Sequence, residues 1–182
     1  SVIVHTRYAT LGDPAQAENN HPLIRPGVML VHNGHIRDHQ LATKTYKIKR
    51  TAQVDSEVLA FLAAKFTPVE ACIAMANLQG TAAVAWLATG DRTGVLHAAR
   101  ITGSPLVVGQ TEHGDTIGAS TEVLLRKACG MSGIVLDWVH HVQPGTYLRL
   151  EHGVIADWHK FEVDFMPTTR PDYTRPSVYG RR

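Results

Sequence analysis

Residues 28–36 read Val-Met-Leu-Val-His-Asn-Gly-His-Ile, an apolar run that reaches the pair Asn33-Gly34. A run of this kind predicts a buried strand that stops at the pair, because Asn-Gly tolerates left-handed backbone angles and forms tight turns. The simplest interpretation of the pair is therefore a hairpin turn. A second interpretation is chemical: an Asn side-chain amide and the N–H of the following Gly can together stabilise a developing oxyanion.

Two further segments carry polar residues where a strand or a helix is expected to end or begin. Arg7 follows a short β-branched run, and an arginine there can grip a carboxylate with two parallel hydrogen bonds, with the Thr10 hydroxyl beside it. Asp55 opens an apolar run of helical spacing, where its carboxylate could receive an ammonium group. Taken singly, Arg7 has the simpler interpretation of a surface ion-pair partner, and Asp55 that of a helix N-cap.

The three segments together favour the chemical interpretation. A guanidinium for a carboxylate, a carboxylate for an ammonium, and two donors for an oxyanion are what a free amino acid needs when its side-chain carbonyl is attacked. The sequence therefore predicts a binding site for such an amino acid, built from Arg7, Asn33, Gly34 and Asp55.

The rest of the chain has the pattern of an α+β protein. The opening residues Ser1–His5 predict a strand, Thr10–Pro22 a loop, and helices begin at Asp55 and at Thr67-Pro68. After Gly80 short strand-like runs separated by turns predict two sheets with helices outside them. These runs are 81–88, 94–100, 106–109, 116–119, 139–142, 145–151 and 153–161, with a short helix at 122–128.

Composition excludes several classes of protein. With 44% apolar and 19% charged residues, the 182-residue chain is neither disordered nor fibrous, and it is expected to form one domain over 1–165 with an extended tail at 166–182. A scattered net charge of +2 argues against nucleic-acid binding. No apolar stretch is long enough to span a membrane and no signal peptide is visible, so a cytoplasmic protein is expected. Cys72 lies in an apolar run and is expected to be buried, and Cys72 and Cys129 form no disulfide framework, which fits reducing conditions.

Seven segments in a fixed order resemble one known family. They are HTRYATLGDP at 5–14, NNHPLI at 19–24, VHNGHI at 31–36, DSEV at 55–58, LQGTAAVAWL at 78–87, LHAARITGSPL at 96–106 and IGAST at 117–121. Over residues 2–160 the chain resembles the glutaminase domain of class II, N-terminal-nucleophile glutamine amidotransferases, in particular the glucosamine-fructose-6-phosphate aminotransferase group. The resemblance implies a four-layer α-β-β-α sandwich.

The resemblance also implies how L-glutamine would be bound. Arg7 would hold the α-carboxylate, with Tyr8 and Thr10 shaping the same pocket, and Asp55 would hold the α-ammonium group. His21, which lies in an Asn-x-His-Pro context, would support the site. No cofactor is implied, and the spacing of the histidines does not match a metal site.

The implied reaction is hydrolysis of glutamine to glutamate and ammonia, the ammonia passing to a partner synthase. The side chain of Asn33 and the backbone N–H of Gly34 would be catalytic by stabilising the tetrahedral intermediate. The nucleophile in this family is an N-terminal cysteine with its own α-amine as base. Ser1 is not expected to replace it, because at about 3.3 Å per strand residue it would lie roughly 20 Å from Arg7.

Two departures from the family pattern leave an alternative open. The first strand and helix of the family fold, with the cysteine, are expected to be missing, and Leu11 stands where related sequences carry histidine. The chain alone is therefore expected to be an inactive part of a glutaminase. The alternative is a catalytically dead amidotransferase fold that serves as a structural or binding subunit of a larger assembly. Whether the chain forms a homo-oligomer is left open.

Overall fold

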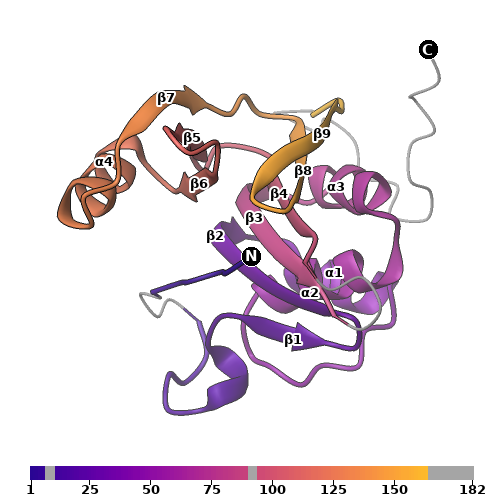
Figure 1. Ribbon diagram of the computed structural model, residues 1–182. Helices are drawn as coiled ribbons and strands as arrows, with labels where there is room; N and C mark the ends of the chain where they lie inside the picture. Colours follow the sequence, from indigo (N-terminus) through magenta and orange to yellow (C-terminus); the bar gives the residue numbers. More distant parts are fainter. Residues whose placement is uncertain (7–10, 90–93, 164–182) are drawn as a thin grey trace.

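The computed structural model describes residues 1–6, 11–89 and 94–163, and these residues form two antiparallel sheets with helices on their outer faces (Figure 1). The six-stranded sheet has the order β1-β2-β3-β4-β8-β9, and the three-stranded sheet has the order β6-β5-β7. The larger sheet comprises β1 (Leu23–Arg25), β2 (Val28–Ile36), β3 (Gly80–Ala88), β4 (Leu96–Arg100), β8 (Thr146–Glu151) and β9 (Val154–Lys160). The smaller comprises β5 (Val107–Thr111), β6 (Thr116–Ala119) and β7 (Leu136–His141).

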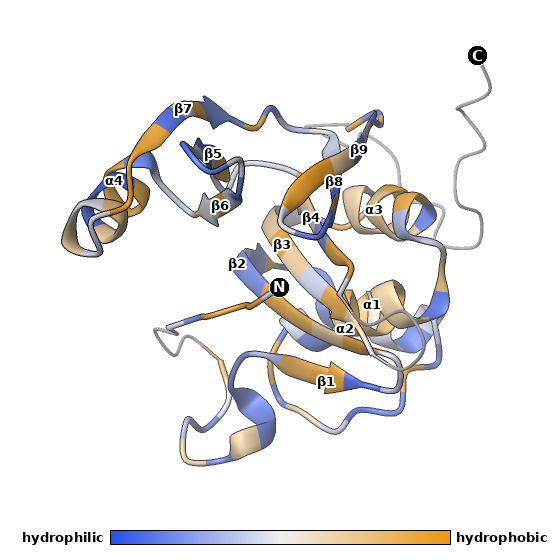
Figure 2. Cartoon of the chain, viewed as in Figure 1, coloured by the Kyte–Doolittle hydropathy of each residue, from blue (hydrophilic) through white to orange (hydrophobic). Residues whose placement is uncertain are grey.

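The helices complete a four-layer α-β-β-α arrangement, as predicted. Three helices, α1 (His39–Thr45), α2 (Ser56–Lys65) and α3 (Pro68–Ala76), cover the outer face of the larger sheet (Figure 1). The fourth, α4 (Glu122–Met131), packs on the smaller sheet, and a short 3-10 helix, η1 (Ala17–Asn19), precedes β1. In Figure 2, α4 carries both hydrophilic and hydrophobic residues, as a helix with one solvent-facing side must.

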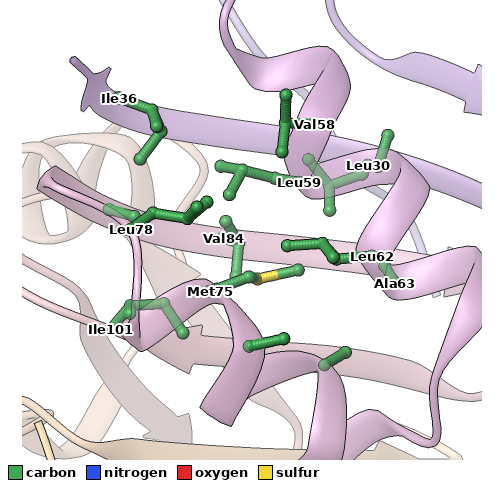
Figure 3. Close-up of a cluster of buried hydrophobic side chains, with 14 of the residues drawn as sticks. Leu30, Ile36, Val58, Leu59, Leu62, Ala63, Met75, Leu78, Val84 and Ile101 are labelled. Atoms are coloured by element: carbon green, nitrogen blue, oxygen red, sulfur yellow. The ribbon is translucent and has the colours of Figure 1, made fainter. Parts of the chain in front are cut away.

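The main hydrophobic core lies between the larger sheet and the helices α2 and α3 (Figure 3). Leu59 and Leu62 of α2 and Met75 of α3 meet Leu30 and Val84 of the sheet, and all five side chains are buried. Each such side chain contributes about 1.5–3 kcal/mol by leaving water. This core therefore fixes the position of α2, which begins directly after Asp55, against β2, which carries Asn33 and Gly34.

The beginning of α3 shows how the sequence sets a helix boundary. Pro68 occupies the first turn, where its missing N–H costs nothing. The Glu70 carboxylate accepts the Thr67 backbone N–H over 3.1 Å while the Thr67 side chain faces the Glu70 backbone N–H, which together form a capping box. The Thr67 hydroxyl also donates to the Glu70 carboxylate over 2.6 Å. The helix predicted to start at Thr67-Pro68 is confirmed.

The space between the two sheets is only partly filled. A small core between them contains Ala98, Val108, Val142, Leu148 and Leu150. Beside it lies a cavity of about 640 Å³, lined by the inner faces of both sheets and by residues 1–6. One face of β2 borders this cavity.

Two predictions about local structure are wrong. Ser1–His5 does not form a strand: residues 1–6 have no ladder partner among the described residues, and Val2 is 82% exposed. The β-branched residues there favour an extended chain, but a strand also needs a neighbouring edge. The strand predicted to stop at Asn33-Gly34 instead continues to Ile36.

The other predicted elements are confirmed to within a few residues, whereas β1 and α1 were not predicted. The helix predicted at 122–128 runs on to Met131. The predicted tail at 166–182 lies outside the described residues and stays a prediction. None of the helices in the described ranges combines the length and the apolar character needed to cross a membrane.

Candidate active site

Strand β2 presents different residues to its two faces. Successive side chains of a strand alternate, so Leu30 and His32 face the helices and are buried, whereas Val31 and Asn33 line the cavity between the sheets. The same strand thus contributes an exposed amide to the cavity and a buried imidazole to the layer behind it.

Asn33 and Gly34 lie inside the ladder between β2 and β3, and the hairpin interpretation of this pair is therefore wrong. Asn33 is opposite Ala83 and Gly34 opposite Ala82. Gly34 has φ = +142°, and a Cβ there would lie 1.9 Å from the carbonyl oxygen of Thr81. Only glycine allows this backbone conformation and this close approach of the two strands.

Asp55 is held next to the end of β2. Its side chain is buried, and its Oδ2 accepts the backbone N–H of Ile36 over 2.6 Å. The imidazole Nδ1 of His35 lies 3.5 Å from the same oxygen. Asp55 stands at the N-cap position of α2 but its carboxylate makes no capping bond to the helix, so the interpretation as a simple N-cap is wrong. The carboxylate instead lies two residues along β2 from Gly34.

His32 connects these two parts of the site from behind. Its Nε2 lies 3.2 Å from the Thr81 carbonyl oxygen, which can only accept, so Nε2 carries the proton. Its Nδ1 then accepts the hydroxyl of Ser56, 2.8 Å away. Burial lowers the pKa of His32 below 6.5, outweighing the Thr81 carbonyl and Asp55, which raise it. His32 is therefore neutral, and the hydrogen bonds at its two ring nitrogens link β2 to β3 and to α2.

A pair of histidines, His5 and His21, lies near this link. The rings of His5 and His21 meet edge to face with centroids 4.2 Å apart, and their Nδ1 atoms are 3.1 Å apart. His5 also lines the cavity and lowers the pKa of His32 through its charge, after the larger effect of burial. His21, predicted to support the site, is thus brought to its edge through His5.

Arg7, Tyr8 and Thr10, the predicted carboxylate-binding residues, lie outside the described residues, and their roles stay predictions. His5 and Thr6, which precede them, line the cavity together with Asn33. Leu11, which follows them, is half-buried.

Several residues of the site were not predicted. The buried side chains of His32 and Ser56 and the backbone carbonyl of Thr81 support it, and Asn19 and Gln53 join the loop before β1 to the loop before α2. One signal was available for His32: a polar side chain in phase with Leu30 on a buried strand face needs a hydrogen-bonding partner.

The two cysteines of the chain are not part of this site. Cys72 on α3 is 0% exposed, and burial raises the pKa of its thiol. Cys129 on α4 is buried against Val107 and Leu125. Neither lines the cavity, whereas Ser1 does and donates its hydroxyl to the Gly94 carbonyl over 3.2 Å. Within the described ranges, no three His, Cys, Asp or Glu side chains are placed to hold a metal ion.

Comparison with known proteins assigns this chain to a family. A family model described as a glutamine amidotransferase domain matches residues 5–127. The chain is 35% identical over 185 residues to the glutamine–fructose-6-phosphate aminotransferase (isomerizing) of Salmonella typhimurium, covering 97% of this chain and 27% of that protein. It is 33% identical over 174 residues to the enzyme of the same name from Treponema pallidum, covering 88% and 24%.

A solved structure agrees on the fold. The glutamine phosphoribosylpyrophosphate amidotransferase of B. subtilis superposes with a TM-score of 0.67 at 21% identity, over 88% of this chain and 34% of that one. The chain spans about a quarter of the length of the curated relatives named above. The chain belongs to the glutamine amidotransferase family and is a class II, N-terminal-nucleophile type domain, similar to the glutaminase domain of glutamine–fructose-6-phosphate aminotransferase.

Proposed function

We propose that this chain forms the glutamine-binding and oxyanion-stabilising part of a glutaminase site. The observation that carries the proposal is the bond from the Ile36 N–H to the Asp55 carboxylate. This bond sets an anionic group two residues from Gly34, on the strand whose Asn33 lines the cavity. An ammonium-binding group and an oxyanion-stabilising pair are thereby fixed to one rigid strand.

The chemistry follows from these positions. The α-ammonium of L-glutamine pairs with Asp55 by replacing the partly exposed imidazole of His35. Arg7 pairs with the α-carboxylate, Tyr8 and Thr10 line that end, and His21 supports it. Attack on the side-chain amide carbonyl places negative charge on its oxygen, which the Asn33 amide and the Gly34 N–H stabilise. Release of ammonia and addition of water give glutamate, and a partner synthase takes the ammonia.

The attacking thiol does not come from Cys72 or Cys129. Both are buried in hydrophobic cores, and a raised thiol pKa leaves Cys72 protonated and unreactive at neutral pH. We therefore expect the 182 residues alone to bind glutamine without hydrolysing it. Turnover requires an N-terminal cysteine joined to this fold, as in the class II mechanism.

A second candidate function is a structural or binding subunit that no longer takes glutamine. The presence of Leu11 in the segment next to the predicted carboxylate-binding residues favours it, because an apolar side chain cannot hydrogen-bond an amino acid. In this alternative the fold is retained for its surfaces, and the site residues have only structural roles.

Calorimetric titration with L-glutamine separates the two functions. We expect saturable binding that is weakened at least about 10-fold, or 1.4 kcal/mol, by Asp55→Asn, with L-asparagine as the control ligand. Glutamate release is then measured for this chain and for a form that starts at the nearest cysteine codon upstream in the gene. Absence of glutamine binding in both forms would overturn the proposal and favour the structural role.

A further inference from the structure

Glu57 is a buried carboxylate outside the proposed glutamine site. It lies on the first turn of α2, two residues after Asp55, and is 2% exposed. A carboxylate is almost never found this deeply buried unless it is paired and hydrogen-bonded. Its surroundings therefore show what holds it there and what it holds in turn.

Both carboxylate oxygens of Glu57 are used. Oε1 accepts the Arg25 guanidinium, the Thr51 N–H at 2.6 Å, the Thr51 hydroxyl at 2.9 Å and the Ala52 N–H at 3.0 Å. Oε2 accepts the Nε–H of Arg50. Burial by itself raises the pKa of Glu57, but the Thr51 and Ala52 hydrogen bonds and the charge of Arg25 outweigh it and lower the pKa. Glu57 is therefore ionised at neutral pH.

The groups that bind Glu57 come from the segment that leads directly to Asp55. Arg50 also donates to the carbonyl oxygens of Ala52, at 3.1 Å, and of Val54, at 2.8 Å. Residues 50–54 are thus held in place by the carboxylate of Glu57 and the guanidinium of Arg50. Asp55 is the next residue, so its position depends on where this segment ends.

The same segment is joined to the loop that carries His21. Gln53 donates its N–H to the Asn19 side-chain oxygen over 2.7 Å and accepts from the Asn19 amide nitrogen over 3.2 Å. The Asp13 N–H also donates to the Gln53 side chain, over 3.1 Å. Through residues 50–54, Glu57 therefore supports both the Asp55 side and the His21 side of the site.

We propose that Glu57 is a positioning residue: by binding residues 50–52 it places the Asp55 carboxylate on the Ile36 N–H, in the position that receives the ammonium group of the substrate. The proposal rests on the proposed function only for the identity of that substrate. The hydrogen bonds of the Glu57 carboxylate go to Arg25 and to residues 50–52, and Glu57 does not line the cavity, so it acts on Asp55 through residues 50–54.

Glu57→Gln tests this role, because it keeps the shape of the side chain and removes its charge. Glu70→Gln is the matched control: Glu70 binds the N–H and hydroxyl of Thr67 at the start of α3 and stabilises a helix beginning away from Asp55. The first readout is hydrogen exchange of the Ile36 amide, which donates to Asp55, beside that of Arg37, which donates to the Gln79 carbonyl at 2.8 Å. The second readout is the Kd for L-glutamine.

We expect Glu57→Gln to speed exchange at Ile36 about 10-fold relative to Arg37 and to raise the Kd about 10-fold, a change of 1.4 kcal/mol. Glu70→Gln should change neither the exchange ratio of Ile36 to Arg37 nor the Kd for L-glutamine. Unchanged values for Ile36 and for the Kd, with faster exchange only at Thr51 and Ala52, would overturn the proposal. If the wild-type chain binds no glutamine, the proposed function fails, and the Ile36 exchange still decides the positioning role.

A second variant guards against a folding failure of Glu57→Gln. Thr51→Ala removes only the hydroxyl bond to Glu57 and leaves the charge cluster intact. We expect the same direction of change at Ile36, by about 2-fold to 5-fold, as loss of one of several bonds allows. No change at Ile36 in Thr51→Ala, together with a normal fold, would count against the proposal.

Discussion

His32 Nδ1 lies 2.8 Å from the hydroxyl oxygen of Ser56, and this contact joins the strand that carries Asn33 and Gly34 to the helix that begins after Asp55. The other ring nitrogen bonds the Thr81 carbonyl, on the strand that Gly34 approaches most closely. One imidazole therefore connects the oxyanion side of the proposed site with its ammonium side.

Removing the hydroxyl at this junction should destabilise the fold. Ser56→Ala leaves the buried Nδ1 of His32 without its donor, so the free energy of unfolding should fall by about 1–3 kcal/mol, measured by urea denaturation. Ser132→Ala, at an exposed serine after α4, is the control and should change stability by less than about 0.5 kcal/mol. Equal effects of the two substitutions would show that the junction contributes nothing specific.

The lowered pKa of His32 predicts a pH dependence of stability. The unfolded chain binds this proton at its ordinary pKa of 6.5, whereas the folded protein binds it only at lower pH, chiefly because of burial. Stability from this group is therefore complete above pH 6.5 and falls as the pH drops towards the folded-state pKa. Denaturant unfolding at a series of pH values measures it.

His32→Gln is the matched variant for the pH dependence, since it places a donor near the Thr81 carbonyl and does not titrate. Its stability should fall less steeply below pH 6.5 than that of the wild type. Identical slopes in the two proteins would contradict the assignment of a neutral His32.

The close approach of β2 and β3 at Gly34 predicts a sharp difference between two glycines. Gly34→Ala places a Cβ 1.9 Å from the Thr81 carbonyl oxygen at φ = +142°, so the strands must separate. We expect a loss of at least about 2 kcal/mol in the free energy of unfolding. Gly118→Ala on β6 meets nothing closer than 3.6 Å and should be tolerated. A stable Gly34→Ala protein with native exchange at Ile36 would refute this account of the close approach between β2 and β3.

The sequence predicted those parts of the fold that depend on local patterns. The run at 28–32 and the Thr67-Pro68 pair contain their own signals, and the elements they predict are present. The strand at Ser1–His5 was wrong because a strand needs a partner edge, which no local pattern can supply. Helix α1 was missed for the related reason that its few apolar residues gain their order from contact with α2.

The site could be predicted in its residue types but not in its connections. Asn33 and Gly34 were identified from one segment and Asp55 from another, and the structure brings Asp55 to the strand that carries the other two. The bond between His32 and Ser56 spans 24 residues, and that between Asn19 and Gln53 spans 34. Such pairings are decided by the tertiary packing of α2 on β2, and a single sequence does not encode them in any local period.

Asn33 offers a direct test of the oxyanion role. In a form of the protein with an N-terminal cysteine, Asn33→Ala should lower kcat about 10²-fold to 10³-fold with little change in KM, because the lost hydrogen bond forms mainly in the transition state. Asn33 is exposed, so stability should change by less than about 0.5 kcal/mol. A rise in KM with unchanged kcat would instead assign Asn33 to ground-state binding.

Glu57 predicts how the protein responds to acid. Its pKa is lowered in the folded state, since the hydrogen bonds of Thr51 and Ala52 and the charge of Arg25 outweigh the opposing effect of burial. The unfolded chain takes up this proton near the ordinary value of 4.5, so the stabilisation by the charged form is complete above pH 4.5 and is lost as the pH falls through the folded-state pKa. The gap in unfolding free energy between wild type and Glu57→Gln should therefore be constant from about pH 7 to about pH 5 and shrink below that.

Glu70→Gln, which removes an exposed carboxylate bound to Thr67, should show a smaller gap throughout. A gap between wild type and Glu57→Gln that stays the same down to about pH 3 would mean that the folded protein does not prefer the charged form of Glu57.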